Sequence, residues 1–139
     1  MMTNLVRLTV LSLLVAGCGG PMKYQLRGSE TSPGSDAKLV AEIDKTRNMT
    51  SFELTATNLT PPDRVVEGGT AYVVWVRRDR TVPWSRAGAL QLVEEGRAGE
   101  ANLTVSEAAF DLLVSAEVST DAASPSGKSV FSQRVEEQE

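Results

Sequence analysis

The sequence predicts an all-β domain, an immunoglobulin-like antiparallel β-sandwich of about seven strands. Three observations support this prediction. Apolar and polar residues alternate with a period of two in short runs between residues 38 and 135, as in strands with one buried face. Segments rich in Gly, Pro and Ser, such as 61–63, 68–69 and 124–127, separate these runs. The apolar content of 41% in 139 residues is that of a globular domain.

The expected strands cover residues 39–43, 52–56, 70–76, 90–92, 101–105, 110–118 and 129–135. The run at 70–76 is nearly continuous in apolar residues, which predicts a strand buried on both faces. Its aromatic residues Tyr72 and Trp75 are expected in the core, where rings supply much of a small sandwich's apolar area. Two alternatives stay open: the first run also fits a helix continuing through Thr46, and residues 106–109 fit a single helical turn.

The first residues predict a secretory signal peptide over 1–17. Arg7 and the amino terminus give a positive start, and an apolar run of about nine residues follows at 8–16. A transmembrane helix needs about 20 apolar residues, so this run is too short to be one.

The end of that segment, Val15-Ala16-Gly17-Cys18, resembles the lipobox of bacterial lipoproteins. The resemblance implies a diacylglycerol on the Cys18 thiol, cleavage before Cys18 and acylation of the new amine. A thiolate suits this step because it is a good nucleophile, and several acyl chains would anchor the protein at about 0.8 kcal/mol per buried methylene. An incidental cysteine in a signal cleaved elsewhere is the alternative. Cys18 is the only cysteine, so an intrachain disulfide is excluded.

The lipobox resemblance implies that the membrane is a partner and that the protein lies in the cell envelope, facing outside the cytoplasm. Gly19, in place of an aspartate, resembles the outer-membrane pattern of bacteria with two membranes. Residues 18–37 are expected to combine the lipidated cysteine with a flexible tether, because Gly, Ser, Pro and Thr dominate 28–37; some 19 flexible residues span about 25 Å. The alternation of Met22, Tyr24 and Leu26 also fits a short ordered stretch. Residues 136–139 form an acidic tail.

Several short motifs between residues 50 and 135 resemble the extracytoplasmic C-terminal domain of anti-sigma-K factors. They are Tyr72-x-x-Trp75, Gly88-Ala89-Leu90, Val114-x-x-Glu117 and Pro125-Ser126-Gly127. The resemblance implies a small β-sandwich outside the membrane. It does not imply anti-sigma activity, because the chain is expected to lack the cytoplasmic domain and the membrane-spanning helix which that activity requires.

The candidate binding patch combines a loop tryptophan with four arginines: Trp84, Arg77, Arg78, Arg80 and Arg86. Such a loop can recognise an envelope protein, a glycan or an anionic surface. Alternatively, the ring covers one end of the sandwich, with the arginines solvated or stacked on it.

Catalytic chemistry and nucleic-acid binding are not expected. The chain has no histidine, and its net charge of −4 opposes a nucleic-acid partner. Glu94-Glu95 and Glu136-Glu137 are sequence neighbours, which point to opposite faces of a strand, so neither pair forms a dyad. No metal or cofactor is expected. The sequence predicts a non-enzymatic envelope lipoprotein whose sandwich binds or spaces envelope components; an extracytoplasmic sensory or regulatory module is the alternative.

Overall fold

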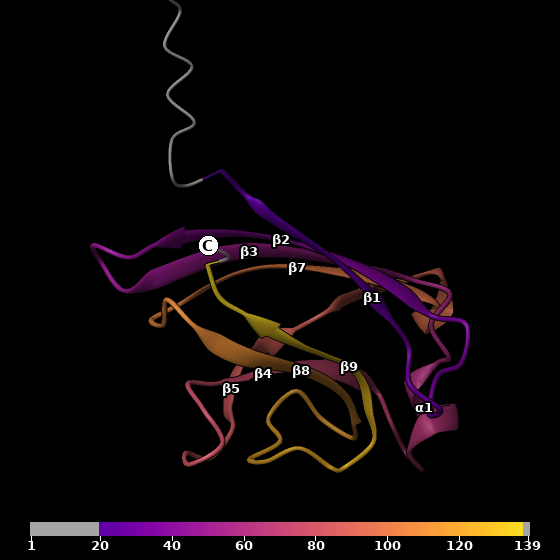
Figure 1. Ribbon diagram of the computed structural model, residues 1–139. Coiled ribbons are helices and arrows are strands. Elements are labelled where there is room, and N and C mark those ends of the chain that lie inside the picture. Colours follow the sequence, from indigo (N-terminus) through magenta and orange to yellow (C-terminus); the bar gives the residue numbers. More distant parts are fainter. Residues whose placement is uncertain (1–19, 138–139) are drawn as a thin grey trace, which may run out of the picture.

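The computed structural model describes residues 20–137, which form two antiparallel sheets packed face to face (Figure 1). The strands are β1 (Met22–Arg27), β2 (Asp36–Asp44), β3 (Met49–Thr57), β4 (Ala71–Arg77), β5 (Ser85–Ala89), β6 (Gln91–Val93), β7 (Ala98–Val105), β8 (Phe110–Glu117) and β9 (Ser129–Val135). A short helix α1 (Pro62–Val65) and a 3-10 turn η1 (Glu94–Gly96) connect them. The predicted all-β sandwich is confirmed.

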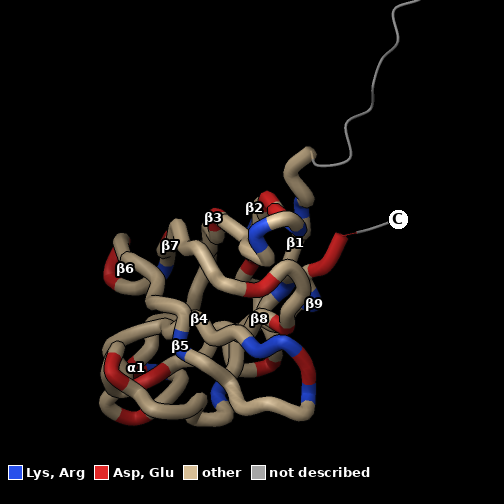
Figure 2. Tube along the Cα trace, turned by 90° about the vertical axis from the view of Figure 1, so that its left-hand side faces the viewer, with Lys and Arg blue, Asp and Glu red and all other residues tan. Residues whose placement is uncertain are grey.

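The strand order matches an immunoglobulin-like domain. One sheet has five strands in the order β1-β2-β3-β7-β6, and the other has four in the order β5-β4-β8-β9. Strands β2 to β9 thus take the places of strands A, B, C, C′, D, E, F and G of such a domain, and β1 is an additional edge strand beside β2. Figure 2, viewed from the side, shows the two rows of strands one above the other.

The main core lies between the sheets and follows the predicted alternation. Its largest fully buried members include Leu39, Leu54, Tyr72, Phe110 and Phe131. The rings of Phe52 and Phe110 meet across the two sheets with their centroids 6.0 Å apart. Packing from both sheets buries these side chains, which is why one face of each strand is apolar.

Strand β4 is buried on both faces, as its continuous apolar run predicts. Its outer-facing residues Ala71, Val73 and Trp75 form a second, small cluster on the far side of the four-stranded sheet. Trp84 from the β4–β5 loop and Ala122 from the β8–β9 loop pack against that cluster. These loops exclude water from a sheet face that would otherwise be exposed.

The structure differs from the tether expected over residues 18–37. Strand β1 pairs with β2 from Met22 to Arg27, so the alternation there is that of an ordered edge strand. The following turn is tied to β9, because the Ser29 amide donates to the Val130 carbonyl at 2.9 Å. A Cβ atom on Gly28 would lie 2.3 Å from the Ser32 carbonyl oxygen, so this turn requires glycine. Composition alone resembles a linker here, but tertiary hydrogen bonds fix the segment.

Strand β5 also lies where the sequence suggests a polar loop, and with β1 it raises the count from about seven strands to nine. The two alternatives with helices are wrong. Residues 39–43 lie within strand β2, and 106–109 form bends rather than a helical turn. Residues 39–43 form a strand and not a helix because β1 and β3 pair with β2 on both sides and satisfy its backbone groups.

Candidate functional site

The arginine–tryptophan cluster (Arg77, Arg78, Arg80, Trp84 and Arg86) surrounds the loop between β4 and β5. Figure 2 shows basic and acidic positions alternating along the start of this loop. Arg77 ends β4 and Arg86 lies on β5, so the two strands place the ends of the cluster. The structure therefore brings the five predicted residues into one region of the four-stranded sheet.

Arg77 is held on two sides. Its guanidinium carbon lies 4.1 Å from the centre of the Trp84 ring, a cation–π geometry. Its Nε donates to Oδ2 of Asp111 at 3.0 Å, and Arg134 donates from Nη1 to Oδ1 of the same carboxylate at 3.3 Å. Arg134 was not expected in the site, because it comes from the distant strand β9; the register of β8 and β9 places it opposite Asp111.

Trp84 and Arg86 hold loops in place. The half-buried ring of Trp84 packs on the cluster around Trp75. Arg86 donates from Nη1 to the carbonyl of Ala122 at 2.8 Å, which joins β5 to the β8–β9 loop. Arg77 is therefore stacked on the Trp84 ring, whereas that ring covers the outer face of the four-stranded sheet and not one end of the sandwich.

Arg78, Arg80 and Arg86 are the exposed arginines of the cluster, and the first two lie in the loop itself. Arg78 donates to Asp79 at 3.3 Å. Hydrogen bonds from the Thr81 hydroxyl and amide, with a smaller contribution from Arg78, hold the pKa of Asp79 below its usual value. Within residues 20–137 no carboxylate pairs with Arg80, so its charge is available to a ligand.

A groove of about 360 Å³ lies beside the loop, which we call the cationic groove. It is lined by Arg77, Arg80, Trp84, Asp111, Leu112, Ser132, Gln133 and Arg134. Three arginines and one aspartate line it, so its local charge is 3 − 1 = +2, although the chain as a whole is acidic. Arginines beside hydroxyl and amide groups suit a carboxylate or phosphate group on a partner.

Three residues of the anti-sigma-K motifs, Trp75, Glu117 and Ser126, belong to a polar network around Ser115. Trp75 donates from Nε1 to the Ser115 hydroxyl at 2.8 Å, and that hydroxyl donates to Oε2 of Glu117 at 2.6 Å. The amide of Ser126 donates to the same carboxylate oxygen at 2.9 Å. The network ties the Pro125–Gly127 segment to β8, which gives these three residues a structural role.

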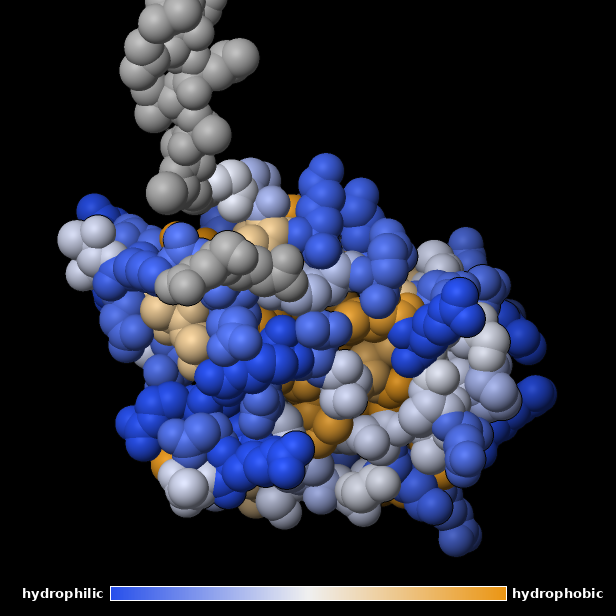
Figure 3. Space-filling model, in the orientation of Figure 1, coloured by the Kyte–Doolittle hydropathy of each residue, from blue (hydrophilic) through white to orange (hydrophobic). Residues whose placement is uncertain are grey.

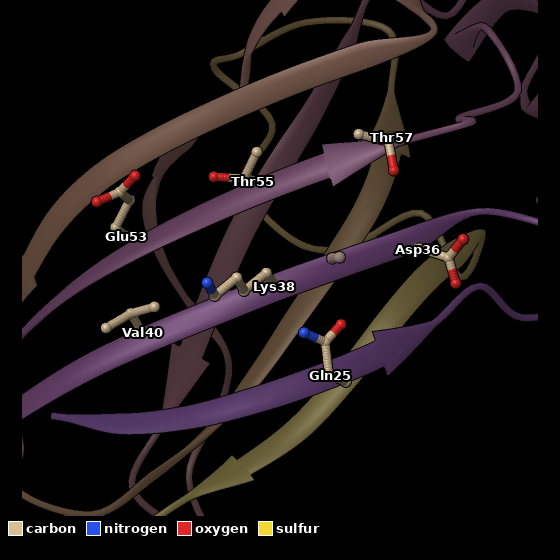
Figure 4. Close-up of a pocket in the computed structure, with 8 residues that line it drawn as sticks. Gln25, Asp36, Lys38, Val40, Glu53, Thr55 and Thr57 are labelled. Atoms are coloured by element: carbon tan, nitrogen blue, oxygen red, sulfur yellow. The ribbon is translucent and has the colours of Figure 1, made fainter.

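The opposite face of the molecule, the outer face of the five-stranded sheet, carries two shallow grooves. One of about 360 Å³ is lined by polar residues such as Gln25, Asp36, Lys38 and Thr55 (Figure 4). Another of about 330 Å³ adjoins it, sharing Val40 and Glu53, and includes Pro21. Figure 3 views the sandwich from the side and shows hydrophilic residues around an apolar region in the middle of that view. Each groove is assembled from several strands, so no local sequence pattern marks this face.

Cys18 lies outside the described residues. Within residues 20–137, no helix has the length and apolar character needed to cross a bilayer, and His, Cys, Asp and Glu side chains nowhere gather as a metal site. By its fold, the described part of the chain belongs to the class of immunoglobulin-like β-sandwiches. Comparisons with protein-family models, curated proteins and solved structures give no match.

Proposed function

We propose that this chain is a lipid-anchored bacterial cell-envelope protein with a non-catalytic β-sandwich that binds an envelope component. The observation that carries the proposal is the lipobox-like Val15-Ala16-Gly17-Cys18, which ends four residues before Met22, the first residue of β1. Acylation at Cys18 would join a membrane anchor almost directly to a folded domain. The domain would lie outside the cytoplasm, on the outer membrane where the bacterium has two.

The cationic groove is the surface proposed for the partner. Arg80 and Arg134 offer donors to a carboxylate or phosphate, and Ser132 and Gln133 offer further hydrogen bonds. Envelope proteins and glycans both carry such anionic groups. A nucleic acid is not proposed, because a net charge of −4 disfavours binding of a polyanion.

Metabolic labelling with radioactive palmitate tests the anchor. We expect the wild-type protein to incorporate label, and we expect Cys18→Ser to incorporate none, because the acyl acceptor is gone. A Cys18→Ser protein that labels as strongly as the wild type would refute the proposal.

A sensory or regulatory module is the second candidate, and the anti-sigma-K resemblance favours it. Trp75, Glu117 and Ser126 of the resembling motifs have a structural role under the β8–β9 loop, and a regulatory use of the domain is to be tested. A gene for a sigma factor or a protease beside this one would favour the second candidate.

A further inference from the structure

The chain enters the sandwich on the outer face of the five-stranded sheet. Pro21 lines a groove there with Glu42 and Ser51, whose side chains point away from the core. Three Cα–Cα steps of 3.8 Å separate Cys18 from Pro21, so their Cα atoms are at most about 11 Å apart. An acyl group on Cys18 is therefore confined to the neighbourhood of this face.

The cationic groove lies on the opposite face of the molecule. Arg77, Asp111 and Arg134 occupy paired positions on β4, β8 and β9, on the side of the four-stranded sheet that faces away from the core. The two sheets of a sandwich pack about 10 Å apart, and side chains add to the thickness on each outer face. The groove and Pro21 are therefore on opposite outer faces, although Arg134 at the rim of the groove also pairs with Glu136, whose carbonyl accepts from Tyr24 at the β1 edge.

We infer that the acyl chains hold the outer face of the five-stranded sheet toward the lipid headgroups and turn the cationic groove away from the membrane. This inference rests on the proposed acylation of Cys18. In this orientation the outer face of the five-stranded sheet contacts the headgroup layer of the membrane that carries the anchor. The groove is then open to components that lie beyond that membrane surface.

Covalent attachment, rather than charge, brings the face to the membrane. Glu42 and Glu53 line the groove that contains Pro21, so anionic headgroups are not attracted there. A Cys18→Ser protein that starts at residue 18 should therefore stay in solution when it is mixed with phosphatidylglycerol vesicles, at low as well as at high salt.

Two matched substitutions test the orientation. Ser51→Cys places a thiol on the outer face of the five-stranded sheet, and Ser132→Cys places one at the cationic groove; both serines are exposed. The sulfur of acylated Cys18 is a thioether, and the chain has one cysteine, so each variant has a single free thiol. A bimane attached to it is quenched over short range by headgroup spin-labelled phosphatidylcholine in phosphatidylcholine vesicles that carry the acylated protein.

The bimane at position 51 should be quenched at least about twofold more strongly than the one at position 132, because the sheet separation of about 10 Å exceeds contact range. Equal quenching, or stronger quenching at position 132, in protein whose acyl mass is confirmed would overturn the orientation and leave the proposed function standing. Protein that carries no acyl mass on Cys18 would overturn the proposed function together with this inference.

Discussion

At the scale of single residues, Tyr72 couples the fold to pH. Its hydroxyl donates to the carbonyl of Thr60, and burial raises its pKa to about 12. The unfolded chain has a tyrosine pKa near 10, so the folded state holds this proton more tightly. The resulting stability is fully present below about pH 10 and is lost as the pH rises toward about 12.

Replacing Tyr72 tests this coupling. Tyr72→Phe should unfold with a free energy lower by about 1 kcal/mol at neutral pH, because the hydrogen bond to Thr60 is lost. The stability of Tyr72→Phe should also fall less than that of the wild type as the pH rises, because the titrating hydroxyl is gone. Urea unfolding between about pH 8 and pH 11 measures this difference. Tyr24→Phe is the matched control, since these are the chain's two tyrosines, and it should keep that decline. An unchanged decline in Tyr72→Phe would contradict the assignment.

Substitutions of Arg80 and Arg77 should have different effects on the stability of the domain, although both residues belong to the same cluster. Arg80→Ala should change the free energy of unfolding by less than about 0.5 kcal/mol, because the side chain is exposed. Arg77→Ala should cost about 1–2 kcal/mol, because it loses the Trp84 stack and the Asp111 pair together. Thermal unfolding measures both effects.

The same Arg80 variant tests the groove. A photo-crosslinker at Ser132 in the intact envelope should capture the partner, and Arg80→Ala should lower the yield several-fold, as expected for a lost charge-assisted hydrogen bond. An unchanged yield would remove Arg80 from the binding surface.

At the scale of elements, substitutions in β1 test whether residues 22–27 belong to the folded domain or to a flexible tether. Leu26 is 5% exposed and belongs to the main core, so Leu26→Ala should lower the free energy of unfolding by about 2–3 kcal/mol. Gln25→Ala, on the solvent face of the same strand, should change it by less than about 0.5 kcal/mol. Urea unfolding measures both values, and equal effects would show that this segment is not part of the core.

Alternation also explains which elements the sequence revealed. Residues 110–117 alternate because one face of β8 packs in the main core, whereas the other face carries polar residues such as Asp111, Ser115 and Glu117. Strand β5 is an edge strand with the sequence Ser-Arg-Ala-Gly-Ala, whose short side chains carry almost no periodic signal. Edge strands need fewer apolar contacts, so their sequences resemble loops.

The whole molecule presents two different outer faces. The five-stranded sheet is polar on its outer side and adjoins the start of the described chain, whereas loops cover the apolar outer side of the four-stranded sheet. The β8–β9 loop is fixed there by Glu117, and Arg86 bonds to it from β5. A membrane anchor on one face and a cationic groove on the other would let a single small domain link two layers of an envelope.

The sequence by itself determined the all-β class, most of the strands and the burial of β4 on both faces, because local alternation records which side of a strand meets the core. It also located the arginines around Trp84. Only the tertiary structure decided that Asp111 and Arg134 join them, and that Pro21 and the groove lie on opposite faces. Those relations depend on strand register and on sheet packing, which join residues far apart in the chain and leave no local pattern.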